Sequence, residues 1–163
     1  MIKKQIVSVL NKPSEIFTII DILEDKFSSL EPVVHAFVPE TARFSRIRKE
    51  ADQMVNGYPK PENHPPLLGL FIGIKDIFHV DGFPTQAGSK LPTIEITGEE
   101  GEFVSRLKKL GVIVLGKTIT TEFAYFAPGP TRNPHNLDQP PGGSRRGSAA
   151  AVAIGLVPFA LGT

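Results

Sequence analysis

The sequence contains no cysteine among its 163 residues. Disulfide bonds, thiol catalysis and zinc–thiolate sites are therefore excluded. We expect a cytoplasmic location, with which the lack of cysteine is consistent. An excess of one charge is also missing, because the formal net charge is +1. A balance this close to neutral argues against direct binding of nucleic acid or of an anionic membrane.

Long hydrophobic runs are missing too. The apolar stretch behind the N-terminal lysines is short and is broken at Asn11-Lys12-Pro13, so we expect no signal peptide. Residues 67–74 form an apolar run that is far too short to span a membrane. The run 149–162 is longer, but Gly155 and Pro158 interrupt it. We interpret this last run as buried protein core.

The composition that is present fits one globular domain with a hydrophobic core, since 40% of residues are hydrophobic and 21% are charged. Apolar periodicity predicts an α/β fold with helices at 15–30, 40–54, 99–110 and 148–154 and strands at 33–38, 68–74, 112–115 and 157–161. Ser14 is the expected N-cap of the first helix, and Ser148 is the N-cap of the last helix if a plain turn precedes it. In the helix 99–110, the expected inward residues are Phe103, Leu107 and Leu110. Loops are expected at 58–66 and 128–147.

Several short segments match or nearly match known functional motifs, but their sequence context argues against those functions. Residues 111–118 spell G-x-x-x-x-G-K-T, but their four middle residues favour an extended strand over a phosphate-binding loop. Residues 142–147 fail the G-x-S-x-G pattern because Arg146 occupies the last glycine position. The S-x-x-K match at Ser105 lies on the polar side of a predicted helix. The four histidines are scattered, so we expect no metal site.

Lys75 follows the predicted buried strand 68–74. An apolar environment penalises the ammonium form, and half-neutralising a lysine at pH 7 requires its pKa to fall by about 3, or about 4–5 kcal/mol. The simpler interpretation is a salt bridge to Asp76. Successive strand residues point to opposite faces, however, so Asp76 is badly placed for that bridge if the strand continues.

Gly142 and Gly143 precede Ser144 in a segment that can adopt unusual backbone conformations. Such geometry persists at functional sites, which makes Ser144 a candidate catalytic residue. The alternative is a plain turn leading into a helix. Spacing alone does not decide between the two.

Five blocks of sequence stand in a fixed order between residues 67 and 155. They read LLGLFIGIKD at 67–76, GFPTQAGS at 82–89, LKKLGVIVLGKTITTEFA at 107–124, RNP at 132–134 and GGSRRGSAAAVAIG at 142–155. They resemble the ordered motifs of the amidase signature family. The resemblance implies an α/β fold with a mixed sheet between helices. It divides residues 1–163 into a helical segment, 1–66, and the first part of the signature core, 67–163.

The resemblance also implies a Ser–Ser–Lys triad that hydrolyses amide bonds without a cofactor. Lys75 matches the lysine base, and Ser144 matches the middle serine, which in this family follows a cis peptide bond. Gly142, Gly143, Arg145 and Arg146 lie in the loop expected beside the substrate and the oxyanion. The nucleophilic serine belongs to a G-T-D-x-G-G-S segment, of which Gly162 and Thr163 look like the first two residues. We therefore expect the nucleophile beyond Thr163 and expect this piece alone to be inactive.

Arg145 and Arg146 depart from the family pattern, which has Ser-Gly at these positions. They either fill the site or bind an acidic group of the substrate. Three functions follow: an amidase acting on a small-molecule amide, a degenerate and non-catalytic relative, or a glutaminase like the A-type subunit of a tRNA-dependent amidotransferase. A piece of this size is also expected to self-associate through exposed core faces.

Overall fold

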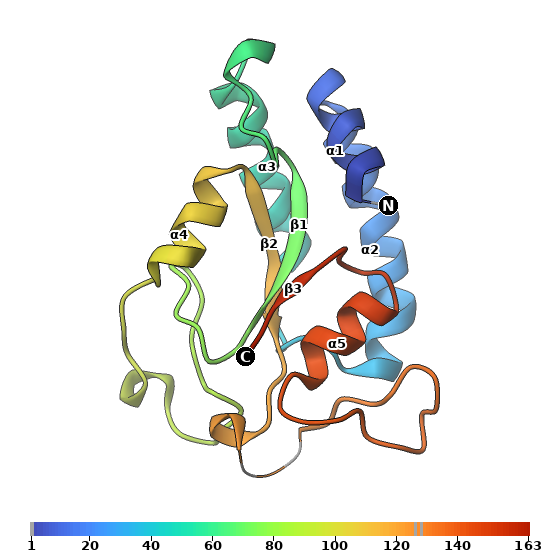
Figure 1. The fold of residues 1–163 in the computed structure, drawn as a ribbon, viewed down its shortest axis with the longest axis vertical. Coiled ribbons are helices and arrows are strands. Elements are labelled where there is room, and N and C mark those ends of the chain that lie inside the picture. Colours follow the sequence, from blue (N-terminus) through green and yellow to red (C-terminus); the bar gives the residue numbers. More distant parts are fainter. Residues whose placement is uncertain (1, 126, 128) are drawn as a thin grey trace.

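The computed structural model describes residues 2–125, 127 and 129–163. Figure 1 shows helices packed around a small central sheet. Along the chain, the helices and strands are α1 Ile2–Asn11, α2 Glu15–Val34, α3 Arg43–Gly57, β1 Leu70–Lys75, α4 Glu102–Lys109, β2 Val112–Thr118, α5 Arg146–Ala153 and β3 Ala160–Leu161. Short 3₁₀ turns lie at Pro61–Asn63, Thr93–Glu95 and Glu122–Ala124. The predicted α/β class is confirmed.

The sheet has the order β2-β1-β3, and β1 pairs in parallel with both neighbours. An antiparallel bridge joins Phe37 to Thr118 at the end of β2. Every residue of β1 and β2 is buried, as expected for parallel strands with helices on both faces. Because β1 lies in the middle, its last residue, Lys75, emerges between two neighbouring strands.

Two apolar clusters cover the two faces of the sheet. One joins β1 and β2 to α4 through Val104 and Leu107, and the other joins the sheet to α1, α2, α3 and α5. In Figure 1, α4 accordingly lies on one side of the strands, and α1, α2 and α5 lie on the other. This arrangement holds the end of β1 between the two layers.

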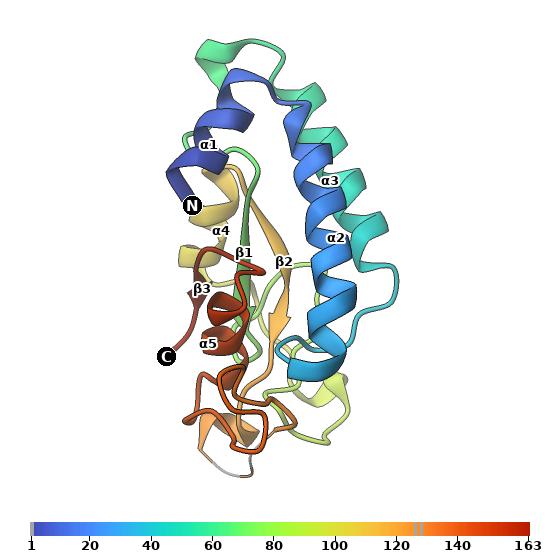
Figure 2. The same cartoon turned by 90° about the vertical axis from the view of Figure 1, so that its right-hand side faces the viewer.

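Helices α2 and α3 pack side by side, as Figure 2 shows. Arg43, the first residue of α3, is buried and ties this pair to the sheet. Its guanidinium donates to the carbonyl oxygens of Leu115 (3.0 Å) and Val38 (2.7 Å). It also lies 4.7 Å from the centroid of the Phe27 ring, a cation–π distance.

The predicted strand 33–38 is wrong. Helix α2 continues through Val34, and only Phe37 makes a β-bridge. The helix ends at the C-cap His35, whose backbone is left-handed (φ 53°) and whose N–H donates to the Glu31 carbonyl. The Glu31 carboxylate then accepts hydrogen bonds from the Ala36 and Phe37 N–H groups at 3.1 and 2.8 Å, which holds the chain after the helix.

Neither predicted serine cap forms. Helix α2 begins at Glu15 as expected, but the Ser14 side chain makes no capping hydrogen bond. Helix α5 begins two residues before Ser148, whose hydroxyl instead bonds Thr118 Oγ1 at 2.7 Å and donates to the Leu161 carbonyl at 3.3 Å. Ser148 therefore ties the helix to β2 and β3.

Two further details of the prediction are corrected. In α4, Val104 and Leu107 face the core, while Phe103 is 60% exposed and Leu110 is 40% exposed. The spacings 103–107–110 and 104–107 both fit a helical period, and packing selects the second. Helix α1 was not predicted, although Ile6 and Val9 have helical spacing.

Other predictions hold, with adjusted bounds. Residues 112–118 form strand β2, so the nominal phosphate-binding loop is extended, as its apolar residues indicated. The last strand is shorter than predicted, because β3 contains only two residues. The loop expected at 128–147 ends at Arg145, and residue 128 lies outside the described residues. Among the residues described, none of the helices combines the length and apolarity needed to cross a membrane.

Candidate active site

Lys75 ends β1 and is completely buried. Its Nζ lies 2.7 Å from Ser144 Oγ, to which it donates, and 2.9 Å from the Thr163 carbonyl oxygen, its second acceptor. The lysine and the serine are 69 residues apart in the sequence. The structure thus brings together the two predicted catalytic residues within direct hydrogen-bonding distance.

The electrostatic surroundings of Lys75 favour its neutral form. Burial lowers the pKa of the Lys75 amine, and the nearby Arg145 cation lowers this pKa further. Within the part of the chain that the structure describes, no carboxylate forms an ion pair with Lys75. A neutral amine at this place has a lone pair that can accept the Ser144 proton.

The alternative salt bridge, between Lys75 and Asp76, does not form. Asp76 pairs instead with Lys117 of β2, with 2.9 Å between Asp76 Oδ1 and Lys117 Nζ. Both side chains are buried, and the Gln86 N–H also donates to Asp76 Oδ2 at 3.3 Å. Burial lowers the pKa of Lys117, and the Asp76 carboxylate opposes this effect. Lys117, which looked like a phosphate-binding lysine in the sequence, is therefore engaged inside the protein.

The backbone of Ser144 has a special geometry and two hydrogen bonds to its carbonyl oxygen. The peptide bond between Gly143 and Ser144 is cis, as the resemblance implied. The Ser144 carbonyl oxygen accepts hydrogen bonds from the Thr120 hydroxyl at 3.3 Å and from the Thr121 N–H at 3.4 Å. These contacts fix the loop against the residues that follow β2.

Gly147 brings the start of α5 against the end of β2. Its N–H donates to the Ile119 carbonyl at 2.9 Å. A Cβ at this position would overlap the backbone of Ala36 and of Ile119, so the approach requires glycine. The small residue places Ser144, three positions earlier, over the end of β1.

Arg145 and Arg146 flank this arrangement. Arg145 is exposed and precedes α5, while Arg146 is half-buried in its first turn. The Arg146 Nε and Nη1 atoms are buried without a hydrogen-bond partner among the described residues. Gly142 and Gly143 are exposed or nearly so. All four residues adjoin Ser144 in the chain, and their place beside the substrate and the oxyanion stays a prediction.

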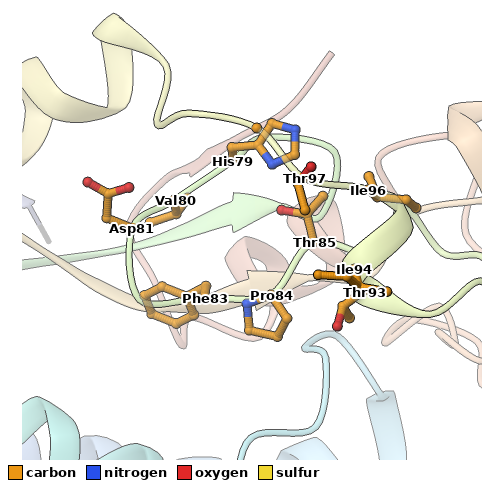
Figure 3. A pocket seen from close by; sticks show the side chains of 11 residues that line it. His79, Val80, Asp81, Phe83, Pro84, Thr85, Thr93, Ile94, Ile96 and Thr97 are labelled. Atoms are coloured by element: carbon orange, nitrogen blue, oxygen red, sulfur yellow. The ribbon is translucent and has the colours of Figure 1, made fainter.

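A separate cavity of about 290 Å³ opens beside the loop that follows β1. Figure 3 shows its lining, which comes from residues 79–85 and 93–98. None of the predicted site residues lines it. It touches the buried ion pair through Thr85, whose hydroxyl accepts a hydrogen bond from Lys117 Nζ at 3.1 Å. Among the residues described, no group of three or more histidines and carboxylates is arranged to hold a metal ion.

Sequence reasoning missed the polar residues that support the pair. Thr163 contacts both members, because its carbonyl also accepts from Ser144 Oγ at 3.4 Å. Thr120 and Thr121 hold the Ser144 carbonyl. Their only sequence signal is their place in the ordered blocks, and nothing in the spacing indicates which atoms they bind.

This chain is similar to known proteins along most of its length. A family model described as Amidase matches residues 19–163, which is most of the chain. The chain belongs to the amidase signature family. Its relatives include the A-type subunit of glutamyl-tRNA(Gln) amidotransferase from Acidothermus cellulolyticus, 37% identical over 147 residues, which is 85% of this chain and 28% of the relative. The AtzE subunit of 1-carboxybiuret hydrolase from Pseudomonas sp. is 37% identical over 153 residues, covering 88% of this chain and 33% of the relative.

Solved structures of amidase signature proteins have the same fold. A structure described as a vestigial complex that reveals the origins of an s-triazine catabolic enzyme matches with a TM-score of 0.83 at 33% identity, covering 99% of this chain and 36% of that one. The A-type subunit of glutamyl-tRNA(Gln) amidotransferase from Thermotoga maritima matches with a TM-score of 0.70 at 27% identity, covering 96% and 33%. The chain thus spans about a third of the length of the curated relatives it matches.

Proposed function

We propose that this chain supplies the lysine and the middle serine of a Ser–Ser–Lys triad that hydrolyses a carbon–nitrogen amide bond. The observation that carries the proposal is the 2.7 Å contact between Lys75 Nζ and Ser144 Oγ in a member of the amidase signature family. The nucleophile in this proposal is a serine that follows Thr163 in a longer chain.

The proposed reaction begins with neutral Lys75. Its amine takes the proton of Ser144 Oγ, and Ser144 takes the proton of the nucleophilic hydroxyl as that oxygen attacks the amide carbon. The proton then returns to the leaving nitrogen, the C–N bond breaks, and an acyl-enzyme is left. Water repeats the same steps on the ester, so that the carboxylic acid leaves and the enzyme is restored. Backbone N–H groups stabilise the oxyanion in both halves.

Labelling of the natural full-length protein with a fluorophosphonate probe tests this proposal. One serine beyond Thr163 should react, and Lys75→Met should abolish both labelling and hydrolysis of a simple amide. Lys108→Met is the matched control, because Lys108 is a lysine of α4 that pairs with Glu100 and is not one of the proposed site residues. If no serine is labelled, the chain is a non-catalytic relative. If Lys75→Met reacts like the unchanged protein, Lys75 is not the base.

The amidotransferase relatives favour a second candidate. Several relatives that carry the name of that enzyme's A-type subunit are 37–38% identical to this chain. In this version the same residues release ammonia from glutamine, and the protein works with partner subunits. Ammonia release from glutamine that rises when such subunits co-purify would support it. Hydrolysis of simple amides by the isolated protein would favour the free-standing amidase.

A further inference from the structure

We propose that Arg145 and Arg146 form a subsite for a carboxylate, so that the preferred substrate is an amide that also carries a carboxylate group. This inference rests on the proposed amide hydrolysis and names its substrate class. A carboxylate is a planar anion, and an arginine side chain binds such a group through two parallel N–H groups.

The first observation is the unpaired state of the two guanidiniums. Among the described residues, no ion pair is formed by Arg132, Arg145 or Arg146, whereas Arg43, Arg46, Arg48 and Arg106 all form ion pairs. Arg145 and Arg146 are the two of these three that adjoin Ser144. Two nitrogens of Arg146 are withdrawn from solvent and have no acceptor. Buried donors without acceptors are unfavourable, so these atoms need a hydrogen-bond acceptor, and a carboxylate oxygen supplies one.

The second observation is the place of these cations. The side chain of Arg145 runs past Gly162, where an added Cβ would lie 3.1 Å from Arg145 Cγ. Gly162 precedes Thr163, whose carbonyl binds Lys75 Nζ. Arg145 therefore lies beside the relay, which is consistent with its effect on the pKa of Lys75.

The third observation is that the local charge is unbalanced. Residues 139–163 contain two arginines and no aspartate or glutamate. Both arginines also lie at the N-terminal end of α5, where the helix dipole disfavours positive charge. A bound carboxylate offsets both unfavourable effects, because it pairs with the two guanidiniums.

The fourth observation is that the adjoining loop leaves space. A Cβ at Gly142 would meet no atom within 4 Å, and one at Gly143 would meet only Thr121 Cγ2 at 3.6 Å. The space next to Ser144 is thus open on the side of the two glycines. A small substrate can lie there with its amide near the relay and its carboxylate near the arginines.

The test compares two substrates of equal length on the natural full-length protein, succinamate and succinamide. The unchanged protein should favour succinamate. Arg145→Gln and Arg146→Gln should each lower kcat/KM for succinamate by about 10- to 100-fold, the value of one hydrogen bond to a charged group. At a pH above the acid limb of the pH–rate profile, Arg146→Gln should leave succinamide within about threefold. An effect of Arg145 on Lys75 acts on both substrates equally, so the succinamate-to-succinamide ratio of kcat/KM should collapse in both variants. Arg106→Gln is the control, because it removes an exposed arginine of α4 without touching the loop.

Protection from the fluorophosphonate probe gives a second readout that needs no variant. Succinate should protect the nucleophilic serine of the unchanged protein, and succinamide should protect it less. An unaltered substrate ratio in both arginine variants, together with equal protection by the two compounds, overturns the carboxylate subsite. In that outcome labelling and succinamide hydrolysis still stand, so the proposed amidase function survives. A protein that neither reacts with the probe nor cleaves either amide fails at the proposed function itself.

Discussion

Asp76 and Lys117 neutralise each other inside the protein, with 2.9 Å between Oδ1 and Nζ. Lys75, the neighbour of Asp76 along the chain, contacts Ser144 and Thr163 instead. The carboxylate nearest to Lys75 in sequence is thus already matched by another cation. This division keeps a negative charge from stabilising the ammonium form of Lys75.

Lys117→Met should destabilise the protein strongly, because it leaves the Asp76 carboxylate buried and unpaired. Loss of one partner of a buried pair costs about 3–5 kcal/mol. Urea unfolding measures the effect. The double variant Asp76→Leu/Lys117→Met should recover much of the loss, and Lys108→Met, which breaks a more exposed pair, should cost far less. A single-variant cost equal to that of Lys108→Met would contradict this account.

Ser144→Ala should remove the relay between Lys75 and the nucleophile. Loss of one proton-transfer group lowers kcat/KM by about 10²–10⁴-fold. Folding should change little, because the contacts of the Ser144 carbonyl with Thr120 and Thr121 do not involve the side chain. Steady-state hydrolysis of succinamide by the full-length protein measures the effect, with the helix residue Ser105→Ala as the control. Equal rates for the two variants would remove Ser144 from the mechanism.

Arg145→Gln should move the acid limb of the pH–rate profile to higher pH. The Arg145 cation lowers the pKa of Lys75, so its removal makes the ammonium form less unfavourable and raises that pKa. The neutral amine then appears only at higher pH. The neutral substrate succinamide keeps this effect apart from carboxylate binding.

Two variants sharpen that measurement. Arg145→Lys retains the positive charge and should keep the limb near its original position, and Arg106→Gln should not move it at all. The lowered pKa of Lys75 also makes the stability of the folded protein depend on pH. Because burial depresses the pKa of Lys75, its contribution to stability is present above the pKa of an unfolded lysine and is lost as pH falls through the folded pKa. If the acid limb of the pH–rate profile does not move in Arg145→Gln, Arg145 does not affect the pKa of Lys75.

Gly73→Ala should destabilise the sheet, because Gly73 is packed closely between β2 and β3. A Cβ at this position would lie 2.7 Å from Thr118 Cγ2 and 3.4 Å from Ala160 Cβ. Overpacking of this kind costs about 1–3 kcal/mol. Gly57→Ala is the matched control, because a Cβ there meets nothing within 4 Å and alanine favours the end of α3 by up to about 1 kcal/mol. Thermal unfolding should therefore move in opposite directions for the two variants, and equal shifts would contradict the packing.

The parts of the fold that sequence could predict are those with one dominant local signal. Strands β1 and β2 are continuous apolar runs, and the strand interpretation of residues 112–118 followed from their side chains. The strand expected at 33–38 failed because β-branched residues favour strands only weakly, and α2 continues through Val34 to a left-handed C-cap at His35. A cap of this kind leaves no periodic pattern in the sequence.

The candidate site shows the same limit. Lys75 and Ser144 were singled out by their segments, but the resemblance to a family, not the spacing, paired them. The bond between Asp76 and Lys117 depends on the register of β1 on β2, which places Lys117 beside Ile74. Neither residue has a sequence feature that predicts this ion pair. The boundary at residue 66, the cytoplasmic location and self-association stay predictions.

Because side chains alternate along β1, a change in the length of this strand would move the side chains at its end. Lys75 and Asp76 are consecutive, yet they serve different neighbours: one reaches the loop before α5, and the other reaches β2. Deleting a single residue before Lys75 would move Asp76 into the place of Lys75, beside Ser144, and Lys75 into the place of Ile74, beside Lys117. The count of residues from Leu70 to Asp76 therefore cannot change without loss of both contacts.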